Sequence, residues 1–440
     1  AEKLHLPQVT YAADIQKDGD TITVKRMLED GYMTIKVHTP CLLTCIKELN
    51  EPRYMSVGGV FEAYSKPLTT LGYEDLKDDP LIDATTIGLK GSPTNIFKSF
   101  TPPQKGVGMM LEGDGKETPA KSWPAFWPLS TSSEKGDRRI MSNFNSADIA
   151  AFKDVWVFCE QREGKLMPTD FELISKGRDL ANELGVNLCG LLLGGEGIES
   201  AAKELGGYGA DKVIVCESPL LATYTTDGYA KVICDVNEYK PEVLLIGATN
   251  IGRDLGPRCA ARLHTGLCAD CTHLDVDVPN YIQFLRESST LDVDSMKWDM
   301  EDRNLKMTRP AFGGHLMATI ICPRFRPCMA TVRPGVMKKN AFDEAKANAV
   351  EIVKPSFTLT AEDIHTDVTE VVKAAKKLVD LIGADYIVSV GRGISKDVEG
   401  GIKLAEELAE VLGGVVGGSR ATIDSGWLSA DHPGGQTGQT

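Results

Sequence analysis

The chain has 440 residues and a formal net charge of −14, with 42% hydrophobic and 25% charged residues. This composition is typical of globular chains of about three domains, and the negative charge disfavours nucleic acid as a main partner, because phosphate binding needs clustered Lys and Arg. No run of about 18 apolar residues predicts a membrane span, and the start AEKLHLPQVTY lacks the apolar segment of a signal peptide.

Most of the eleven cysteines stand in apolar, strand-like runs such as WVFCE and VIVCES. Buried free thiols in a reducing compartment explain this placement, so we expect a cytoplasmic protein. Two closer pairs, Cys268 with Cys271 and Cys322 with Cys328, have the spacing of redox or metal sites. Because no histidine cluster accompanies them, we interpret them as ordinary thiols.

Residues 1–121 form a first block, with short strands predicted in TITVKRML and YMTIKVHTP and long loops rich in Gly, Pro, Ser and Thr after them. The block has too little periodic apolar sequence for an independent core. It is therefore predicted to be an extended arm that wraps another part of the structure.

Residues 122–140 look like a faulty junction. Thr118 and Pro119 are a good helix start, yet SWPAFWPLSTSS cannot continue a helix. One interpretation is an ordinary exposed linker. We favour a second interpretation, in which the reading frame is shifted. In the shifted frame the codons for Trp-Pro encode Ala and those for Phe-Trp encode Leu. The resulting sequence can read KETPAKLAGILAAKHII, an amphipathic helix, followed by a stop codon. In this hypothesis residues 122–140 are translated from frameshifted coding DNA and intergenic DNA. Two genes, the second starting at Met141, have then been read as one.

Residues 141–337 alternate apolar strands with helical patterns. VWVFCEQ, LCGLLLGG, KVIVCES and EVLLIGA have the length and composition of buried strands, and DFELISKGRDLANEL and YAKVICDVNEY are typical of helices. Such alternation predicts a parallel sheet that is covered on both faces. The charged residues 338–357 are expected to be a linker.

Residues 358–440 predict a second α/β unit. The expected order is a helix in VTEVVKAAKKLVDLIG, a strand in YIVSVG, a helix in EGGIKLAEELAEVLGG and a strand in VVGG. We expect this unit to be cut short at Thr440.

Polar residues follow both strands of this second unit. Arg392 lies in a GRG turn after the first strand, and Ser419 and Arg420 follow the next one. Ligands of open α/β sheets bind at the carboxyl ends of strands, where glycines let the backbone approach a diphosphate. With the later GQTG, Gly435–Gly438, these groups suit a large, flat cofactor that carries a diphosphate; the alternative is a set of exposed turns.

These motifs resemble those of the electron transfer flavoprotein family. GRG, GGSRATIDSGW and GQTG are similar to the flavin-binding domain of its α subunit, as are GATNIGRDLGPRCAARLHTGLCADCT (247–272) and MATVRPGVM. VKRMLEDGYMTIKVHTPCLLT (24–44) and NEPRY (50–54) resemble the carboxyl-terminal half of the β subunit, although Met33 stands where an acidic or amide residue is expected. The resemblance covers nearly everything except 122–140.

The resemblance implies a fold and a division of the chain. The fold is α/β: a Rossmann-like parallel sheet domain (141–337, the α-subunit amino-terminal domain) and a truncated FAD-binding domain (358–440), preceded by an extended β-subunit arm (1–121). It also implies a bacterial α/β heterodimer in which the FAD site of the α part is incomplete, and leaves open a second FAD or AMP in a missing β part.

The resemblance also implies roles for the site residues. Arg392 and Ser419 would contact the FAD diphosphate and its neighbourhood. Arg420 would lie by the isoalloxazine ring, where a cation favours the reduced flavin. Gly434, Gly435, Gln436 and Thr437 would follow the ring edge, with Thr437 near the reactive nitrogen. Relatives carry something like DRQVGQTGK where this chain has Asp431, His432 and Pro433; His432 is interpreted as a substitution or sequence error, not a proton carrier.

Partners follow from the resemblance as well. It implies electron exchange with an acyl-CoA dehydrogenase, whose docking loop would lie after Tyr54. The segment PLIDATTIGLKGSPTNIFKSFTPP looks like that of electron-bifurcating relatives, which oxidise NADH and reduce ferredoxin. No catalytic set for a substrate reaction is evident.

Other interpretations of the same residues remain open. A nicotinamide dehydrogenase would need a GxGxxG turn, and no convincing copy is present. An adenine-nucleotide-binding module without redox activity is an alternative, as is a polypeptide that binds no flavin because half the site is missing. Arg253, Asp254 and Arg258 could serve a nucleotide, but we expect ion pairs within the helix and between domains.

Overall fold

The computed structural model describes residues 1–80, 82–103, 145–236, 239–373, 381, 384 and 386–428. The suspected junction 122–140 and the four residues Gly434, Gly435, Gln436 and Thr437 lie outside these ranges. No helix in the described part is both long enough and apolar enough to cross a membrane.

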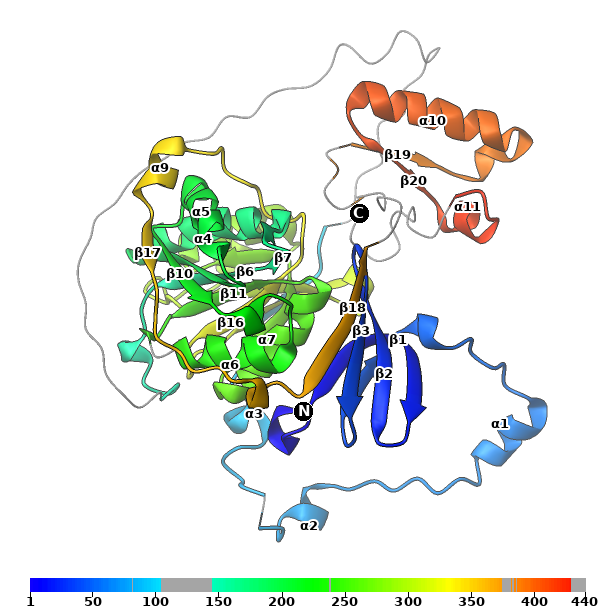
Figure 1. The fold of residues 1–440 in the computed structure, drawn as a ribbon, viewed down its shortest axis with the longest axis horizontal. Coiled ribbons are helices and arrows are strands. Elements are labelled where there is room, and N and C mark those ends of the chain that lie inside the picture. The colour runs from blue at the N-terminus through cyan, green and yellow to red at the C-terminus, as the bar shows by residue number, and fades with distance from the viewer. Residues whose placement is uncertain are drawn as a thin grey trace.

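A seven-stranded parallel sheet forms the largest layer, in the order β12-β16-β11-β6-β9-β10-β17 (Figure 1). Strands β6, β9, β11 and β16 are buried along their whole length, as expected for continuous apolar runs in a sheet with two covered faces. The predicted parallel α/β domain is therefore confirmed. The strands are β6 Val155–Cys159, β9 Leu188–Gly194, β10 Lys212–Glu217, β11 Val243–Gly247, β12 Leu267–Cys271, β16 Cys328–Val332 and β17 Glu351–Val353.

Helices cover both faces of this sheet. Successive side chains along each strand point to opposite faces of the sheet. Those on one face form a core with α4 and α5, and those on the other face form a core with α6 and α7. Helix α4 begins with Pro168 at its first position and ends at Gly185, whose φ of 68° is left-handed. The helices of this domain are α4 Pro168–Leu184, α5 Ala202–Tyr208, α6 Thr226–Val236, α7 Asn250–Arg262, α8 Val278–Ser288 and α9 Glu344–Ala349.

The predicted linker 338–357 contributes structure to the domain. It contains α9 and β17, and β17 pairs in parallel with β10 at the edge of the sheet. Gly206 and Gly207 of α5 leave room for Val350 and Phe342 of this segment, because a Cβ on either glycine would lie under 3.0 Å from those side chains.

A second sheet joins residues 8–45 of the first block to residues 366–373. Its order is β18-β3-β2-β1-β4, and its inner side chains extend the core around α6 and α7. Figure 1 shows it beside the parallel domain. The first block therefore has a packed sheet in addition to an extended arm. The strands are β1 Gln8–Asp18, β2 Thr21–Leu28, β3 Gly31–His38, β4 Leu42–Cys45 and β18 Thr366–Lys373.

Strand β18 corrects the sequence prediction of a helix in VTEVVKAAKKLVDLIG. Its first six residues, 368–373, are extended and pair with β3. Val and Thr are good strand residues, and the antiparallel ladder with β3 decides between the two conformations. Residues 374–380, 382 and 383 lie outside the described part of the chain.

Three smaller sheets complete the described structure, and one of them is the antiparallel pair β7 and β8. The largest of the three has the order β13-β14-β15-β5 and takes its last strand from the first block. The remaining one has only β19 and β20, which lie under α10 in the second α/β unit (Figure 1). The remaining elements are β5 Asn95–Phe100, β7 Gln161–Arg162, β8 Lys165–Leu166, β13 His273–Asp275, β14 Lys306–Ala311, β15 Leu316–Ile321, β19 Ile387–Val390, β20 Val415–Gly418, α1 Val57–Ala63, α2 Tyr73–Leu76, α3 Gly88–Gly91, α10 Val398–Leu412 and α11 Arg420–Asp424.

Helix α7 approaches strand β11 so closely that one position excludes any side chain. A Cβ on Gly252 would lie 1.8 Å from the carbonyl oxygen of Gly247. We expect Gly252→Ala to lower the free energy of unfolding by about 3 kcal/mol, at the upper end for overpacked positions, because the clash is with backbone. Urea unfolding measures this, and Gly58→Ala in exposed α1, where a Cβ meets nothing within 4 Å, is the control.

Candidate functional site

The carboxyl ends of β19 and β20 define the candidate site. The two strands are parallel, and Val390 pairs with Gly418 at their ends. The Ser419 amide donates to the Val390 carbonyl at 2.9 Å, which ties the two following turns together. The structure therefore brings Arg392, Ser419 and the backbone of Arg420 to one edge, as expected from the order of strands and turns.

These two turns are open and polar. Arg392 is exposed, and a Cβ on Gly391 or Gly393 would meet nothing within 4 Å. The Ser419 side chain makes no capping hydrogen bond to α11. Within the described part of the chain, Arg392 therefore has a free guanidinium group beside accessible backbone. That set of donors fits the diphosphate and sugar of FAD.

The glycines that end β20 keep the strand tightly packed under these turns. A Cβ on Gly417 would lie 2.9 Å from Ile387 Cγ2, and one on Gly418 would lie 2.6 Å from both Leu428 Cδ1 and Thr422 Oγ1. Side chains at these positions would push the two turns apart. The roles predicted for Gly434, Gly435, Gln436 and Thr437 fall outside the described residues and stay predictions.

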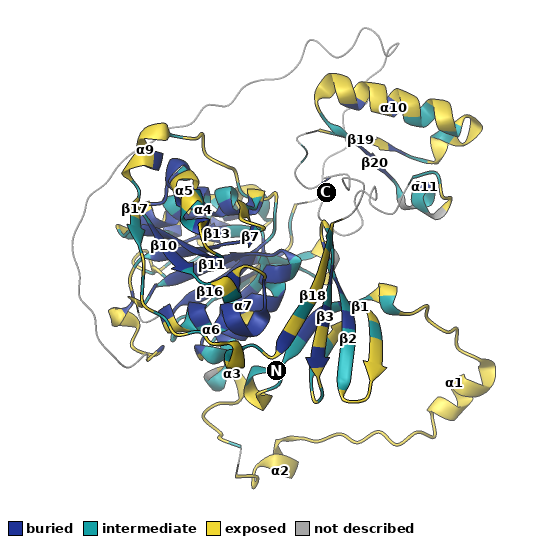
Figure 2. Ribbon diagram, viewed as in Figure 1, coloured by how far each residue is buried: buried dark blue, intermediate teal, exposed yellow. Residues whose placement is uncertain are grey.

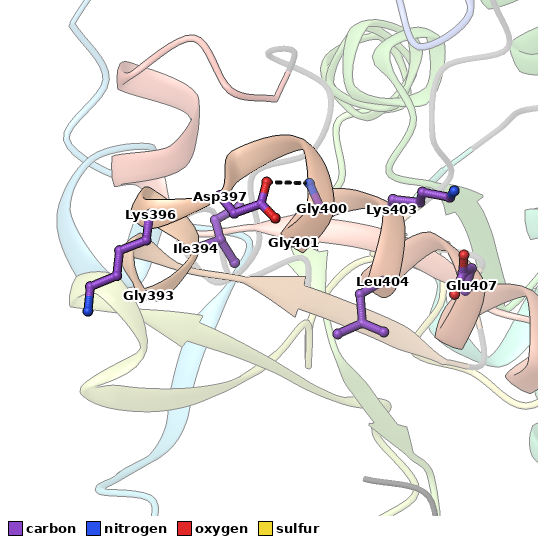
Figure 3. Close-up of a pocket in the computed structure, with 9 residues that line it drawn as sticks. All are labelled: Gly393, Ile394, Lys396, Asp397, Gly400, Gly401, Lys403, Leu404 and Glu407. Carbon is purple, nitrogen blue, oxygen red and sulfur yellow. Dashed lines mark hydrogen bonds between the residues drawn. The ribbon is translucent and has the colours of Figure 1, made fainter.

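A shallow pocket of about 490 Å³ lies next to this edge, between the turn after β19 and the first turns of α10 (Figure 3). Asp397 caps α10 by accepting from the Gly400 amide at 3.0 Å. Lys396 and Lys403 are the cations of the pocket, and sequence reasoning did not single them out. The run ISKDVEGG could have indicated Lys396, because there a lysine directly precedes the aspartate that caps α10. The lining residues are Gly393, Ile394, Lys396, Asp397, Gly400, Gly401, Lys403, Leu404 and Glu407.

The three charged residues of the α7 signature bind other protein groups. Asp254 is buried and lies 3.2 Å from the Arg26 guanidinium. Arg258 lies 3.1 Å from Asp227, and Arg253 donates to Asp270 at 2.7 Å. The expectation of interdomain ion pairs is confirmed, because Arg26 belongs to the first block. The ion pairs expected within the helix are not found among the described residues, since the partners of these three side chains lie outside α7.

Asp254 has further partners from both blocks. Its carboxylate accepts from Gln8 at 2.6 Å, from the Tyr224 hydroxyl at 2.7 Å and from the Thr226 hydroxyl at 2.5 Å. Four donors thus converge on one buried carboxylate. This arrangement leaves it no acceptor capacity for a nucleotide.

Asp270 provides a test of pH dependence. Burial raises its pKa, but the hydrogen bond from Arg333 and the charges of Arg253 and Arg333 outweigh burial and hold the pKa below its usual value. The stabilisation is therefore present above about pH 3.9, the unfolded pKa, and is lost as the pH falls through the folded pKa. We expect the stability difference between the parent chain and Asp270→Asn to shrink below about pH 4 in urea titrations; a pH-independent difference would contradict this.

All eleven cysteines are free thiols. Cys268, Cys271, Cys322 and Cys328 are buried in the core of the parallel domain, and burial raises the pKa of Cys159 in the same core. Among the described residues, no group of three or more His, Cys, Asp or Glu side chains is placed to hold a metal ion.

Comparison with known proteins gives matches over both α/β units. Residues 1–75 and 155–358 match the electron transfer flavoprotein domain, and residues 380–440 match the electron transfer flavoprotein FAD-binding domain. FAD is thus the cofactor of the matched domain.

Comparison with individual proteins agrees with these domain matches. The chain is 71% identical over 299 residues to the acryloyl-CoA reductase electron transfer subunit beta of Anaerotignum propionicum, which spans 68% of this chain and 81% of that protein. It is 49% identical over 297 residues to electron transfer flavoprotein subunit alpha of Clostridium acetobutylicum, spanning 67% of this chain and 80% of the relative. It is 69% identical over 118 residues to the acryloyl-CoA reductase electron transfer subunit gamma of A. propionicum, a match that spans 27% of this chain and 44% of the relative. The chain therefore belongs to the electron transfer flavoprotein family.

Proposed function

We propose that this protein carries electrons on FAD between an acyl-CoA dehydrogenase and other redox partners in the cytoplasm. The observation that carries the proposal is the convergence of Arg392, Ser419 and the Arg420 backbone at the strand ends of a unit that matches an FAD-binding domain. Bound FAD supplies the ability to accept and release electrons.

In this proposal the chain's own residues bind and orient the cofactor. Arg392 neutralises the diphosphate, and Ser419 donates a hydroxyl beside it. Arg420 lies next to the flavin ring, where its charge favours the reduced form. Gly434, Gly435, Gln436 and Thr437 follow the ring edge, as the resemblance to the family implies.

We further propose that residues 1–121 and 141–440 derive from two subunits of one heterodimer, joined through 122–140. Two relatives from A. propionicum, named subunits gamma and beta, support this, because they match 27% and 68% of the chain. Sequencing the DNA across codons 121–141 tests it. A frame shift with a separate start at Met141 is expected, and one continuous frame would contradict it.

The exposed segment after Tyr54 is the proposed docking surface for the dehydrogenase. Large apolar side chains are exposed along it, which is unusual outside interaction surfaces (Figure 2). The names of the A. propionicum relatives favour a reductase of an unsaturated acyl-CoA as the physiological partner. The exposed side chains are Tyr54, Met55, Val57, Val60, Phe61, Tyr64, Leu68 and Leu71.

NADH-dependent electron bifurcation to ferredoxin is the finer form of the proposal. It requires a second FAD in the β part, in place of AMP. Counting the flavins per heterodimer separates the two cases, since a bifurcating protein would contain two FAD and a simple carrier one FAD with AMP.

Spectroscopy of the purified protein tests the proposed function directly. We expect the visible absorption of bound flavin, its bleaching under anaerobic reduction, and its return when an acyl-CoA dehydrogenase and an enoyl-CoA are added. A dehydrogenase alone, without this protein, is the control for direct reaction. A colourless protein that releases only adenine nucleotide on denaturation would overturn the proposal.

A further inference from the structure

Strand β5 is a segment of the first block that completes a sheet of the parallel domain. It pairs antiparallel with β15 from Asn95 opposite Ile321 to Phe100 opposite Met317. The other strands of that sheet, β13, β14 and β15, all come from residues 273–321. Addition of an extended segment to an open sheet edge is a common mode of recognition between proteins.

Two aromatic side chains fix this strand to helix α8. The register shifts once along β5, next to Phe97, so that Phe97 and Phe100 both reach the aromatic cluster over the sheet. The ring centroids of Phe97 and Tyr281 are 5.8 Å apart, and those of Phe100 and Phe284 are 6.1 Å apart. Phe100 is 2% exposed, as expected for an anchor residue in a desolvated pocket.

Further contacts hold the segment on both sides of β5. Arg324 donates to the Ser92 carbonyl, and the Thr290 amide donates to the Thr101 carbonyl at 3.4 Å. Gly266 leaves space for Thr94, since a Cβ at that glycine would lie 2.4 Å from Thr94 Cγ2. Residues 92–101 are thus in contact with the parallel domain along their whole length.

Most of the residues that lead to this segment are exposed, in contrast to the segment itself. Residues 51–80 are exposed without exception, so this stretch supplies no packed surface of its own (Figure 2). The segment 92–101 is therefore attached to the parallel domain by its own contacts, with the small sheet of residues 8–45 as a separate attachment.

We propose that residues 92–101 form a strand anchor by which one polypeptide of the heterodimer holds the other. This inference rests on the two-subunit composition proposed above. The anchor consists of the β5 ladder and the pair Phe97 and Phe100, and its receptor is the open edge of β15 together with α8. The anchor binds whether or not it is covalently connected to its receptor.

The test uses the full chain with two engineered protease sites, one between Lys66 and Pro67 and one after Lys121. After cleavage, residues 67–121 are connected to the rest by non-covalent contacts alone. We expect this fragment to stay bound during gel filtration in the parent chain and in Ile96→Ala, whose side chain is 70% exposed on the same strand. We expect Phe97→Ala with Phe100→Ala to weaken retention at least about 100-fold, as for paired aromatic anchors, and to release it.

Release of the fragment from the parent chain, or its retention in the double Phe variant, would overturn the anchor. Hydrogen exchange of the Leu316–Ile321 amides that face β5 is the second readout, with protection expected in the bound state and lost on release, while the amides that face β14 stay protected. If the double variant does not fold, the cleaved parent chain and Ile96→Ala still decide the question. The flavin spectrum of the uncut parent chain, recorded in parallel, shows separately whether the proposed electron carrier fails.

Discussion

Replacing Asp254 by alanine is expected to lower the free energy of unfolding by about 3–5 kcal/mol, because it leaves the Arg26 charge buried without its counter-ion. Arg26 and Asp254 are 1% and 2% exposed. The same substitution removes the acceptor of the Tyr224 and Thr226 hydroxyls, which are buried as well. Chemical unfolding followed by circular dichroism measures the effect.

Two variants control this prediction. Asp254→Asn keeps an acceptor for the hydroxyls and removes only the charge, so we expect a smaller loss than for alanine. Asp294→Ala breaks an exposed pair with Arg286, whose side chains are 75% and 48% exposed, and is expected to cost about 0–1 kcal/mol. If Asp254→Ala unfolded at the same denaturant concentration as Asp294→Ala, the buried ion pair would not be holding the two blocks together.

Replacing Arg392 by alanine is expected to weaken FAD binding about 10- to 100-fold, the usual range for a hydrogen bond to a charged group. Arg392 is exposed at the end of β19 and, among the described residues, has no ion-pair partner, so stability should not change. The dissociation constant is measured by titrating flavin-free protein with FAD and following the quenching of flavin fluorescence.

Lys403→Ala is the matched control, because it removes the same charge from α10, on the other side of the pocket beside the turn (Figure 3). We expect it to bind FAD like the parent chain. Parent-like FAD affinity in the Arg392 variant would contradict the placement of the diphosphate at the strand ends. Weaker FAD binding in both variants would assign the pocket itself to the cofactor.

The parallel sheet could be predicted because its signals are local. Buried parallel strands are continuous apolar runs, and β6, β9, β10 and β11 lie where those runs are. Pro168 and Gly185 likewise set the ends of α4 without help from distant residues. The approach of Arg392 to Ser419 followed from the same logic, since the ends of adjacent parallel strands share one edge.

The helix predicted from Val368 onward was wrong for a physical reason. The run Val368–Lys373 has the composition of either a helix or a strand, and the ladder to β3, more than 300 residues earlier, makes it a strand. In the first block, by contrast, strands form where TITVKRML and YMTIKVHTP predicted them, and their sheet buries its inner face against α6 and α7 of another block, as expected for a block without an independent core. Long-range pairing of this kind leaves no periodic signal in a short window.

The sequence by itself determined the two α/β units, the turns that carry Arg392 and Ser419, and the resemblance to a flavoprotein family. These features depend on residues close together in the chain or on motifs read one after another. Only the tertiary structure decided that Asp254 binds Arg26, that β18 joins the first block to the last, and that Phe97 and Phe100 anchor β5 on α8. Each of these pairs residues from distant parts of the chain, and their energy comes from burial and hydrogen bonding that exist only after the blocks have packed together.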